Sequence, residues 1–308
     1  MRLAHLHLPN ITPFTRVSNI QQILTTRLLA HKKAASLPPS SASSVTSIYP
    51  LAKPPDPTII TFTPNPVYTT GRRDLPPSNT SSPSDSKPSP ELSLPPSLEP
   101  IRSLLTPPAA NDPSSARPVA EYHPTLRGGQ TTYHGPGQLV AYTILDLRRL
   151  GLTPRCHIRL LENSVIDVLR GFGIQGFVTE DPGVWVSDSS DSTKQDPKKI
   201  TAVGVHLRRH ISSYGIGLNV TEEPMWFFRQ IVACGLEGRE ATSLEGQGVK
   251  GVTMEEVADR FVNAFVERLR TDFPPGPPGA SEGIDEVYKI QVEDILQEGK
   301  QEQARLFE

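Results

Sequence analysis

The sequence predicts a fold of the α/β class, of the α+β type, in which a mixed β-sheet carries helices on one or more faces. Two long amphipathic segments are interleaved with several short strand-like segments. Proline- and serine-rich stretches interrupt this pattern, and without them roughly 200 to 220 residues remain, the size of one domain. The 308-residue chain has only two cysteines, so we expect no disulfide framework and a reducing compartment.

Charge and hydropathy argue against an anionic main partner and against a membrane span. The net charge is -2, which gives no reason to expect a nucleic-acid or anionic-membrane surface as the main partner. The sequence contains no run of about 18 apolar residues, so we expect no membrane span.

Low-complexity insertions divide the chain. We expect one domain over residues 4–272, insertions at 35–55, 75–118 and 187–198, and a weakly patterned, peripheral tail at 273–308. Between residues 75 and 118, 12 of 44 residues are proline and 11 are serine. Such a composition buries too little apolar surface to offset the entropy of ordering, so these insertions are expected to be disordered.

The N-terminal segment, residues 1–34, is basic and contains no acidic residue, because Asp56 is the first one in the chain. This profile is typical of a mitochondrial transit peptide. Alternatively, residues 14–34 form a basic surface helix of the domain itself. The pattern alone leaves both interpretations open.

Regular elements are expected in the following order. Alternation predicts strands within 58–74 and 135–147, a hairpin from 183–186 and 200–207, and a strand at 213–220. Helices are predicted at 154–174, which begins with Pro154, and at 253–270, which opens with the capping box Thr253 and Glu256.

A glycine-rich stretch, RGGQTTYHGPGQ, runs from Arg127 to Gln138. It lacks the Gly-Lys-Ser/Thr ending of a phosphate-binding loop and the helix context of a dinucleotide site. Arg127, His134 and the backbone N–H groups of such a loop can bind a carboxylate, a phosphate or an oxyanion. The alternative is a plain glycine-rich connection between strands.

Cys234 is the candidate nucleophile, because it precedes a glycine on an irregular turn that could expose its sulfur. Cys156 lies within a predicted helix, where a half-buried structural role is the expectation. The groups that could accept the thiol proton are His134, His206, His210 and Lys199. Lys199 could equally be a solvated lysine at the end of a polar insertion, and no His, Cys and carboxylate set has metal-ligand spacing.

The pattern becomes specific when four segments are taken together. In chain order they are RGGQTTYHGPGQLVAYTILDL, KITAVGVHLRR, YGIGLNV and VACGLEGREATSL, and they are preceded by NPVYTTGRR. In order and spacing they resemble the lipoyl(octanoyl) transferases, over most of residues 4–270 apart from the insertions. The resemblance implies the mixed sheet of the biotin and lipoate protein ligases.

The resemblance also implies a reaction, the first step of protein lipoylation. Members of the family move an octanoyl group from acyl carrier protein to a lysine of a lipoyl domain, through a thioester on cysteine. Carried over to this chain, Cys234 is the nucleophile and Lys199 is the general base that favours its thiolate. The substrate-binding residues would be Arg127, Gly128, Gly129, Gln130, Thr131, Thr132, Tyr133, His134, Ala202, Val203, Gly204, Gly215, Ile216 and Gly217.

The implied partners are octanoyl-acyl carrier protein as donor and lipoyl domains as acceptors, namely the glycine cleavage H protein and the E2 subunits of 2-oxoacid dehydrogenases. No cofactor and no metal are implied, and a mitochondrial location is expected. A carrier-to-carrier lipoyl or octanoyl amidotransferase, an ATP-dependent lipoate-protein ligase and an inactive acyl-carrier binder remain as alternatives. The chain departs from the family at Ala233, where proline is usual, and at Tyr214, where histidine often precedes the glycine.

Overall fold

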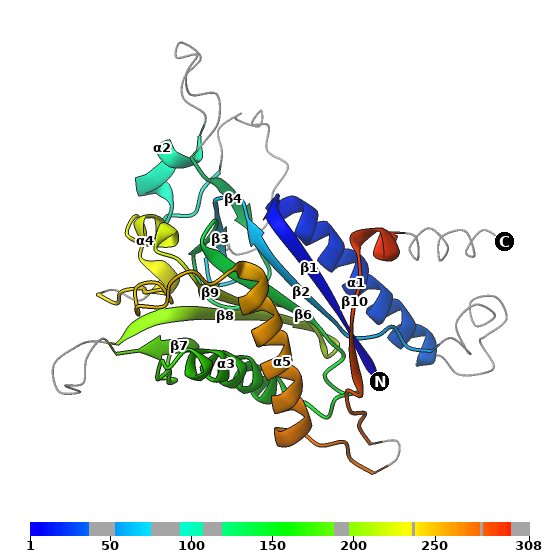
Figure 1. Ribbon diagram of the computed structural model, residues 1–308. Coiled ribbons are helices and arrows are strands. Elements are labelled where there is room, and N and C mark those ends of the chain that lie inside the picture. The colour runs from blue at the N-terminus through cyan, green and yellow to red at the C-terminus, as the bar shows by residue number, and fades with distance from the viewer. Residues whose placement is uncertain are drawn as a thin grey trace, which may run out of the picture.

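The computed structural model describes residues 1–36, 53–74, 93–106, 119–187, 197–235, 238–277 and 280–296. Its main feature is a seven-stranded mixed sheet in the order β10-β1-β2-β6-β9-β8-β7 (Figure 1). The strands are β1 (Arg2–Thr12), β2 (Thr58–Pro64), β6 (Gln138–Ile144), β7 (Gly183–Val186), β8 (Lys198–Arg208), β9 (Ile211–Asn219) and β10 (Glu286–Lys289). β1 runs parallel to both β2 and β10, and the remaining neighbours are antiparallel.

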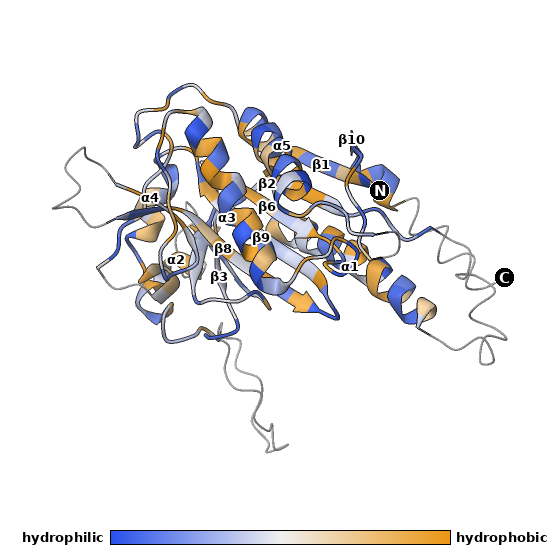
Figure 2. Cartoon of the chain, turned by 90° about the horizontal axis from the view of Figure 1, so that it is seen from below, coloured by the Kyte–Doolittle hydropathy of each residue, from blue (hydrophilic) through white to orange (hydrophobic). Residues whose placement is uncertain are grey.

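Helices cover both faces of this sheet (Figure 1). On one face, α3 (Pro154–Gly171) and α5 (Met254–Asp272) pack on side chains such as Leu139 and Ala141. On the other face, α1 (Phe14–Ala35) packs on the alternate residues of the same strand, Val140 and Tyr142. Figure 2 shows hydrophobic and hydrophilic residues interleaved along these helices, as expected of helices with one buried face. Within the described part of the chain, no helix has the length and apolarity to cross a membrane.

A second sheet of three strands, in the order β4-β3-β5, lies beside the main one. Its strands are β3 (Val67–Thr70), β4 (Glu121–Pro124) and β5 (Thr132–His134). Three short helices pack against it, namely the 3₁₀ helix η2 (Glu99–Ile101), α2 (Arg102–Leu105) and α4 (Glu223–Phe228).

The expectation of disorder over the whole insertion at 75–118 is wrong for residues 93–106. The apolar side chains of Leu98, Ile101 and Leu105 are buried against Tyr68 and Tyr133. These leucines and the isoleucine supply the apolar surface that the surrounding proline- and serine-rich composition lacks. The rest of this insertion, and most of the other two, lies outside the described residues.

The N-terminal segment belongs to the folded domain. β1 lies inside the sheet between β2 and β10, and Leu3 and Leu6 are fully buried. α1 follows it and buries Val17, Ile20 and Leu24. The interpretation of residues 14–34 as a helix of the domain is therefore confirmed, and a strand at residues 2–12 precedes it.

The C-terminal tail is less peripheral than its weak pattern suggests. β10 adds an edge strand beside β1, pairing Arg2 with Glu286 and His5 with Lys289. The helical segment after it, at residues 292–296, buries Val292 and Ile295 against the α1 side of the sheet. The domain thus extends beyond residue 272, because an exposed edge of β1 is covered by pairing.

The two long helices begin as predicted. The Thr153 side chain accepts a hydrogen bond from the backbone N–H of Cys156, and Pro154 occupies the first turn of α3. The Thr253 side chain accepts one from the N–H of Glu256 at the start of α5. The carboxylate of Glu256 accepts from Arg260 one turn later, so only one half of the predicted capping box is seen.

Candidate active site

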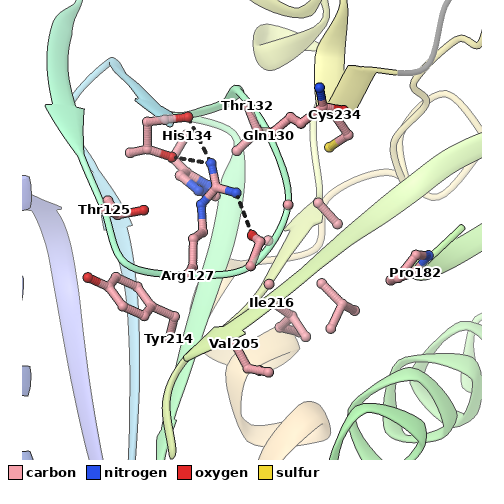
Figure 3. A pocket seen from close by; sticks show the side chains of 18 of the residues that line it. Thr125, Arg127, Gln130, Thr132, His134, Pro182, Val205, Tyr214, Ile216 and Cys234 are labelled. Atoms are coloured by element: carbon pink, nitrogen blue, oxygen red, sulfur yellow. Dashed lines mark hydrogen bonds between the residues drawn. The ribbon is translucent and has the colours of Figure 1, made fainter. Parts of the chain in front are cut away.

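A cavity of about 280 Å³ lies between the glycine-rich segment before β5 and the central parts of β8 and β9 (Figure 3). Its walls combine backbone with apolar and hydroxyl side chains. The lining residues include Thr69, Thr125, Arg127, Gly128, Gly129, Gln130, Thr132, His134, Tyr142, Pro182, Lys199, Ala202, Val203, Gly204, Val205, Tyr214, Gly215, Ile216, Gly217 and Cys234.

Glycine is required where β8 and β9 face polar side chains at short range. A Cβ built on Gly217 would lie 2.8 Å from the Gln138 side-chain oxygen and 3.2 Å from the His134 ring. A Cβ on Gly204 would lie 3.2 Å from Cδ of Arg127. These glycines therefore allow the backbone itself to form the cavity wall.

Cys234 lies in the short 3₁₀ turn η3 (Ala233–Gly235) and has a left-handed backbone, with φ of 57°. Its N–H donates to the carbonyl of Thr131 over 2.7 Å, which ties the turn to the glycine-rich segment. The partly buried thiol is directed into the cavity in Figure 3. A non-glycine residue held in this conformation is often found at functional sites.

Lys199 is held by β7 on one side and by residues 240–242 on the other. It pairs with Trp185 of β7, its N–H donates to the carbonyl of Glu240, and its own carbonyl accepts from Thr242. The ammonium donates to the carbonyl of Pro182 over 3.1 Å and lies 4.6 Å from the centre of the Trp185 ring. The strand pairing thus fixes the Lys199 backbone, although residues 188–196 of the preceding insertion lie outside the described chain.

Cys234 and Lys199 also line a second cavity, of about 260 Å³. Thr132, Ala202 and Gly217 are shared by the two cavities as well. The second cavity is bounded further out by Trp185, Met225, Phe228, Arg229, Val232, Arg239 and Glu240. The thiol and the amine therefore stand where the two cavities meet.

Arg127 places a buried cation under the glycine-rich segment. Its guanidinium donates to the carbonyl and hydroxyl of Thr69, over 2.8 and 2.9 Å, and to the carbonyl of Gly128. Its Nε has no hydrogen-bond partner among the described residues. Burial lowers the pKa of Arg127, and the nearby Cys234 opposes this shift. An arginine keeps its charge in proteins, so it supplies positive potential beside the thiol.

His134 is neutral and has a fixed tautomer. The side chain of Asn219 donates to the carbonyl of Thr242, so its oxygen accepts from Gln138, whose own oxygen then accepts from Nδ1 of His134 over 2.6 Å. Burial, together with the charge of Arg127, lowers the pKa of His134 to about 4. At neutral pH this ring is a weak base.

Of the 14 residues predicted to bind substrate, 12 line the first cavity and two do not. Thr131 instead accepts from Cys234 and donates from both its N–H and its hydroxyl to Asp74. Tyr133 points to the other side of β5, where its ring stacks on Phe227 with centroids 4.2 Å apart. Alternation along β5 explains the split, because Thr132 and His134 flank Tyr133.

The other sequence candidates lie elsewhere. His206 and His210 line neither cavity. Cys156 is partly buried and packs against the core beneath α3. Within the described ranges no three His, Cys, Asp or Glu side chains are grouped as a metal site would require. Sequence reasoning missed Tyr142, whose aromatic type gave no sign of a position beside the glycines. Tyr214, the residue at which the chain departs from the family pattern, also lines the cavity.

Comparison with known proteins identifies relatives of this chain. Residues 116–266 match the family described as the lipoyl protein ligase A/B catalytic domain. A probable octanoyltransferase of Schizosaccharomyces pombe is 39% identical over 198 residues, 64% of this chain and 71% of the relative. The human mitochondrial octanoyl-acyl-carrier-protein:protein N-octanoyltransferase is 42% identical over 151 residues, 48% of this chain and 61% of the relative.

Solved structures agree on the fold. A T. acidophilum lipoate protein ligase with bound lipoic acid superposes with a TM-score of 0.50 at 13% identity, covering 98% of this chain and 93% of that chain. P. falciparum LipL1 in complex with lipoate gives a TM-score of 0.51 at 9% identity, covering 99% and 70%.

The fold and the sequence match define an acyltransferase built on the lipoate protein ligase fold. Within that class, the chain belongs to the lipoyl(octanoyl) transferase family, the octanoyltransferases of protein lipoylation.

Proposed function

We propose that this enzyme moves an octanoyl group from acyl carrier protein to a lysine of a lipoyl domain, through a thioester on Cys234. The observation that carries the proposal is the position of Cys234 and Lys199 where two cavities meet. The human relative's name gives octanoyl-acyl carrier protein as the donor and a protein as the acceptor, in agreement with this reaction.

In the first half-reaction the Lys199 ammonium releases a proton to solvent, and the resulting amine takes the proton of the Cys234 thiol. The thiolate attacks the carbonyl carbon of the donor thioester, and the resulting oxyanion collapses with release of the carrier's thiolate. That thiolate takes the proton from the Lys199 ammonium, which leaves an octanoyl thioester on Cys234. The buried guanidinium of Arg127 supplies positive charge near the reacting groups.

In the second half-reaction Lys199 removes a proton from the acceptor lysine's ammonium group. Lys199 releases that proton to solvent, and the free amine attacks the acyl-enzyme carbonyl. As the intermediate collapses, Lys199 takes a second proton from the nitrogen, the amide forms, and the leaving Cys234 thiolate recovers this proton from Lys199. The donor thioester is already activated and the amide is the more stable product, so the scheme uses no ATP.

The proposed mechanism requires the Lys199 side chain to turn towards the thiol. Its ammonium now donates to the carbonyl of Pro182 and sits against Trp185. A lysine has a flexible four-carbon side chain, so the amine can turn between this resting position and the thiol while its backbone stays fixed. The aromatic ring of Trp185 stabilises the charged form that each proton transfer produces.

The two cavities suit different parts of the substrates. The first, with its glycine backbone and Val203, Val205 and Ile216, offers the apolar surroundings that an octanoyl chain prefers. The second opens beside exposed Val232 and would admit the slender arms of the donor and acceptor. The glycine cleavage H protein and the E2 subunits of 2-oxoacid dehydrogenases are the proposed acceptors.

The test is intact-protein mass spectrometry after incubation with octanoyl-acyl carrier protein without ATP. We expect a gain of one octanoyl group that is absent in Cys234→Ala and retained in the matched control Cys156→Ser. Adding a lipoyl domain should discharge the adduct onto the domain. If acceptor modification requires ATP and free octanoate, the chain is a ligase, and the proposal is wrong.

A mitochondrial location is part of the proposal. The human and Drosophila melanogaster relatives are named as mitochondrial, whereas others of similar identity are bacterial. Since β1 lies inside the sheet, cleavage after residue 34 would remove a structural strand. Any import signal within residues 1–34 would therefore be expected to stay on the folded enzyme, which N-terminal sequencing of the imported protein would test.

A further inference from the structure

The far end of the first cavity borders a separate groove. Figure 3 shows Tyr214 and Thr125 on the side of the cavity away from Cys234. Phe14, Thr125 and Tyr214 line both the cavity and a groove of about 510 Å³ against α1. These three residues are therefore the partition between the two spaces. On the groove side the walls are mixed, and the polar side chains of Gln22, Thr25, His206 and Arg208 lie beside apolar ones.

Two members of the partition are firmly anchored. Phe14 is buried, its N–H donates to the Asn65 side chain over 2.8 Å, and its ring stacks on His123. Thr125 is buried and its hydroxyl donates to the carbonyl of Thr70 over 2.7 Å. Neither can withdraw without breaking contacts of the fold.

Tyr214 differs, because a local backbone feature positions its ring. The pairing of β6 with β9 ends at the pair Tyr142 and Gly215. Tyr214, the residue before Gly215 in the chain, has a left-handed φ of 61°. Its N–H donates to the side-chain oxygen of Gln21 on α1 over 2.7 Å, and its ring meets Tyr142 edge-on at 5.3 Å. The helix and the neighbouring ring thus hold an unfavourable backbone conformation in place.

We propose that Tyr214 is the specificity residue that closes the acyl cavity and limits the length of the acyl chain accepted. This rests on the proposed function, in which the acyl chain extends from Cys234 into the cavity. A chain longer than the cavity must displace the Tyr214 ring, since Phe14 and Thr125 are fixed. Exclusion is therefore steric and acts on the terminal methylenes.

Removing the ring would join the cavity to the groove. The groove walls have a larger polar share than the cavity walls, so a longer chain would gain less apolar contact there than in the cavity. We therefore expect loss of discrimination against long chains, and no new preference for one of them. Glycine suits the left-handed conformation at position 214 better than tyrosine does, so Tyr214→Gly should not unfold the chain. Tyr214→Phe is the matched control, because it keeps the ring and removes only the hydroxyl.

The experiment measures the rate at which Cys234 is acylated by hexanoyl-, octanoyl-, decanoyl- and dodecanoyl-acyl carrier protein, followed by intact mass. One methylene too many in a shaped pocket costs about 10-fold or more. The wild-type rate should therefore fall by at least about 10-fold from octanoyl to decanoyl donor, and Tyr214→Gly should abolish most of that fall. Tyr214→Phe should keep the wild-type ratio.

The two proposals fail in distinguishable ways. If Tyr214→Gly is acylated by the octanoyl donor and still rejects decanoyl as the wild type does, Tyr214 does not set chain length, while the proposed function stands. If the wild-type enzyme takes no acyl group on Cys234 from any donor, the proposed function and this inference both fall.

Discussion

Gly71, next to the glycine-rich segment of the site, should tolerate a methyl group poorly. It follows β3 directly and packs against the glycine-rich segment at very short range. A Cβ at this position would lie 2.2 Å from the carbonyl oxygen of Gly129 and 2.9 Å from that of Gly128. Both are backbone atoms, so no side-chain rotation relieves the contact.

The magnitude for Gly71→Ala follows from this geometry. To reach ordinary C···O contact the segment must retreat by roughly 1 Å or more. Overpacking of this kind costs about 1 to 3 kcal/mol of unfolding free energy. For a domain of this size each kcal/mol lowers Tm by about 2 to 4 °C, so a fall of roughly 2 to 12 °C is expected.

Gly71→Ala should reduce the rate of octanoyl transfer more strongly than it reduces the stability of the fold. The retreating segment includes Thr131, whose carbonyl holds the N–H of Cys234. A misplacement of about 1 Å at a reacting group can cost about 10²-fold in rate. The assay is octanoyl transfer at saturating donor, with Tm measured on the same preparation.

Gly128→Ala is the stability control, because its Cβ would meet only the carbonyl of Val205, at 3.5 Å. Its Tm should stay near the wild-type value. A Gly71→Ala protein with wild-type Tm and wild-type transfer would refute the reasoning, since the segment would then be free to move without consequence for Cys234.

Three further predictions concern the base, the buried histidines and the ordered part of the insertion. Lys199→Ala should slow Cys234 acylation by about 10² to 10⁴-fold in a single-turnover assay, whereas the neighbouring Lys198→Ala should not. If Lys199→Ala and the wild type are acylated at equal rates, another group is the general base. Burial lowers the pKa of His134 and His157 to about 4, below the ordinary 6.5, so the unfolded chain binds protons first as the pH falls. The unfolding free energy from urea titration should thus drop by about 2 kcal/mol per histidine between pH 7 and 5, and a flat profile would contradict this. Leu98→Ala should cost about 2 to 5 kcal/mol in the same titration, and no loss would mean that residues 93–106 do not stabilise the domain.

The long helices were predictable because their stabilising features are local. The spacing of Leu161, Val165 and Leu169 marks the buried face of α3, and Thr253 marks the start of α5. β1 was missed because a strand buried on both faces does not alternate, and Leu3, Ala4 and Leu6 are all buried in it. Its basic flank was also compatible with a targeting signal.

The site could be predicted only in part for a different reason. Cys234 and Lys199 are 35 positions apart, and no local pattern reports that they share two cavities; the family resemblance supplied that pairing. The position of Tyr214 depends on a left-handed φ and on Gln21 of a distant helix. Both are consequences of tertiary packing, which a pattern of residue types does not encode.

The pairing of β1 with β10 has a consequence for folding during synthesis. β2 becomes available to β1 once about 60 residues have been made, but residues 286–289 must emerge before the other edge of β1 is paired. Such long-range parallel pairing slows folding and leaves a strand edge open to intermolecular contact in the meantime. Chains truncated before β10 should therefore aggregate, even though every residue proposed for catalysis precedes the truncation.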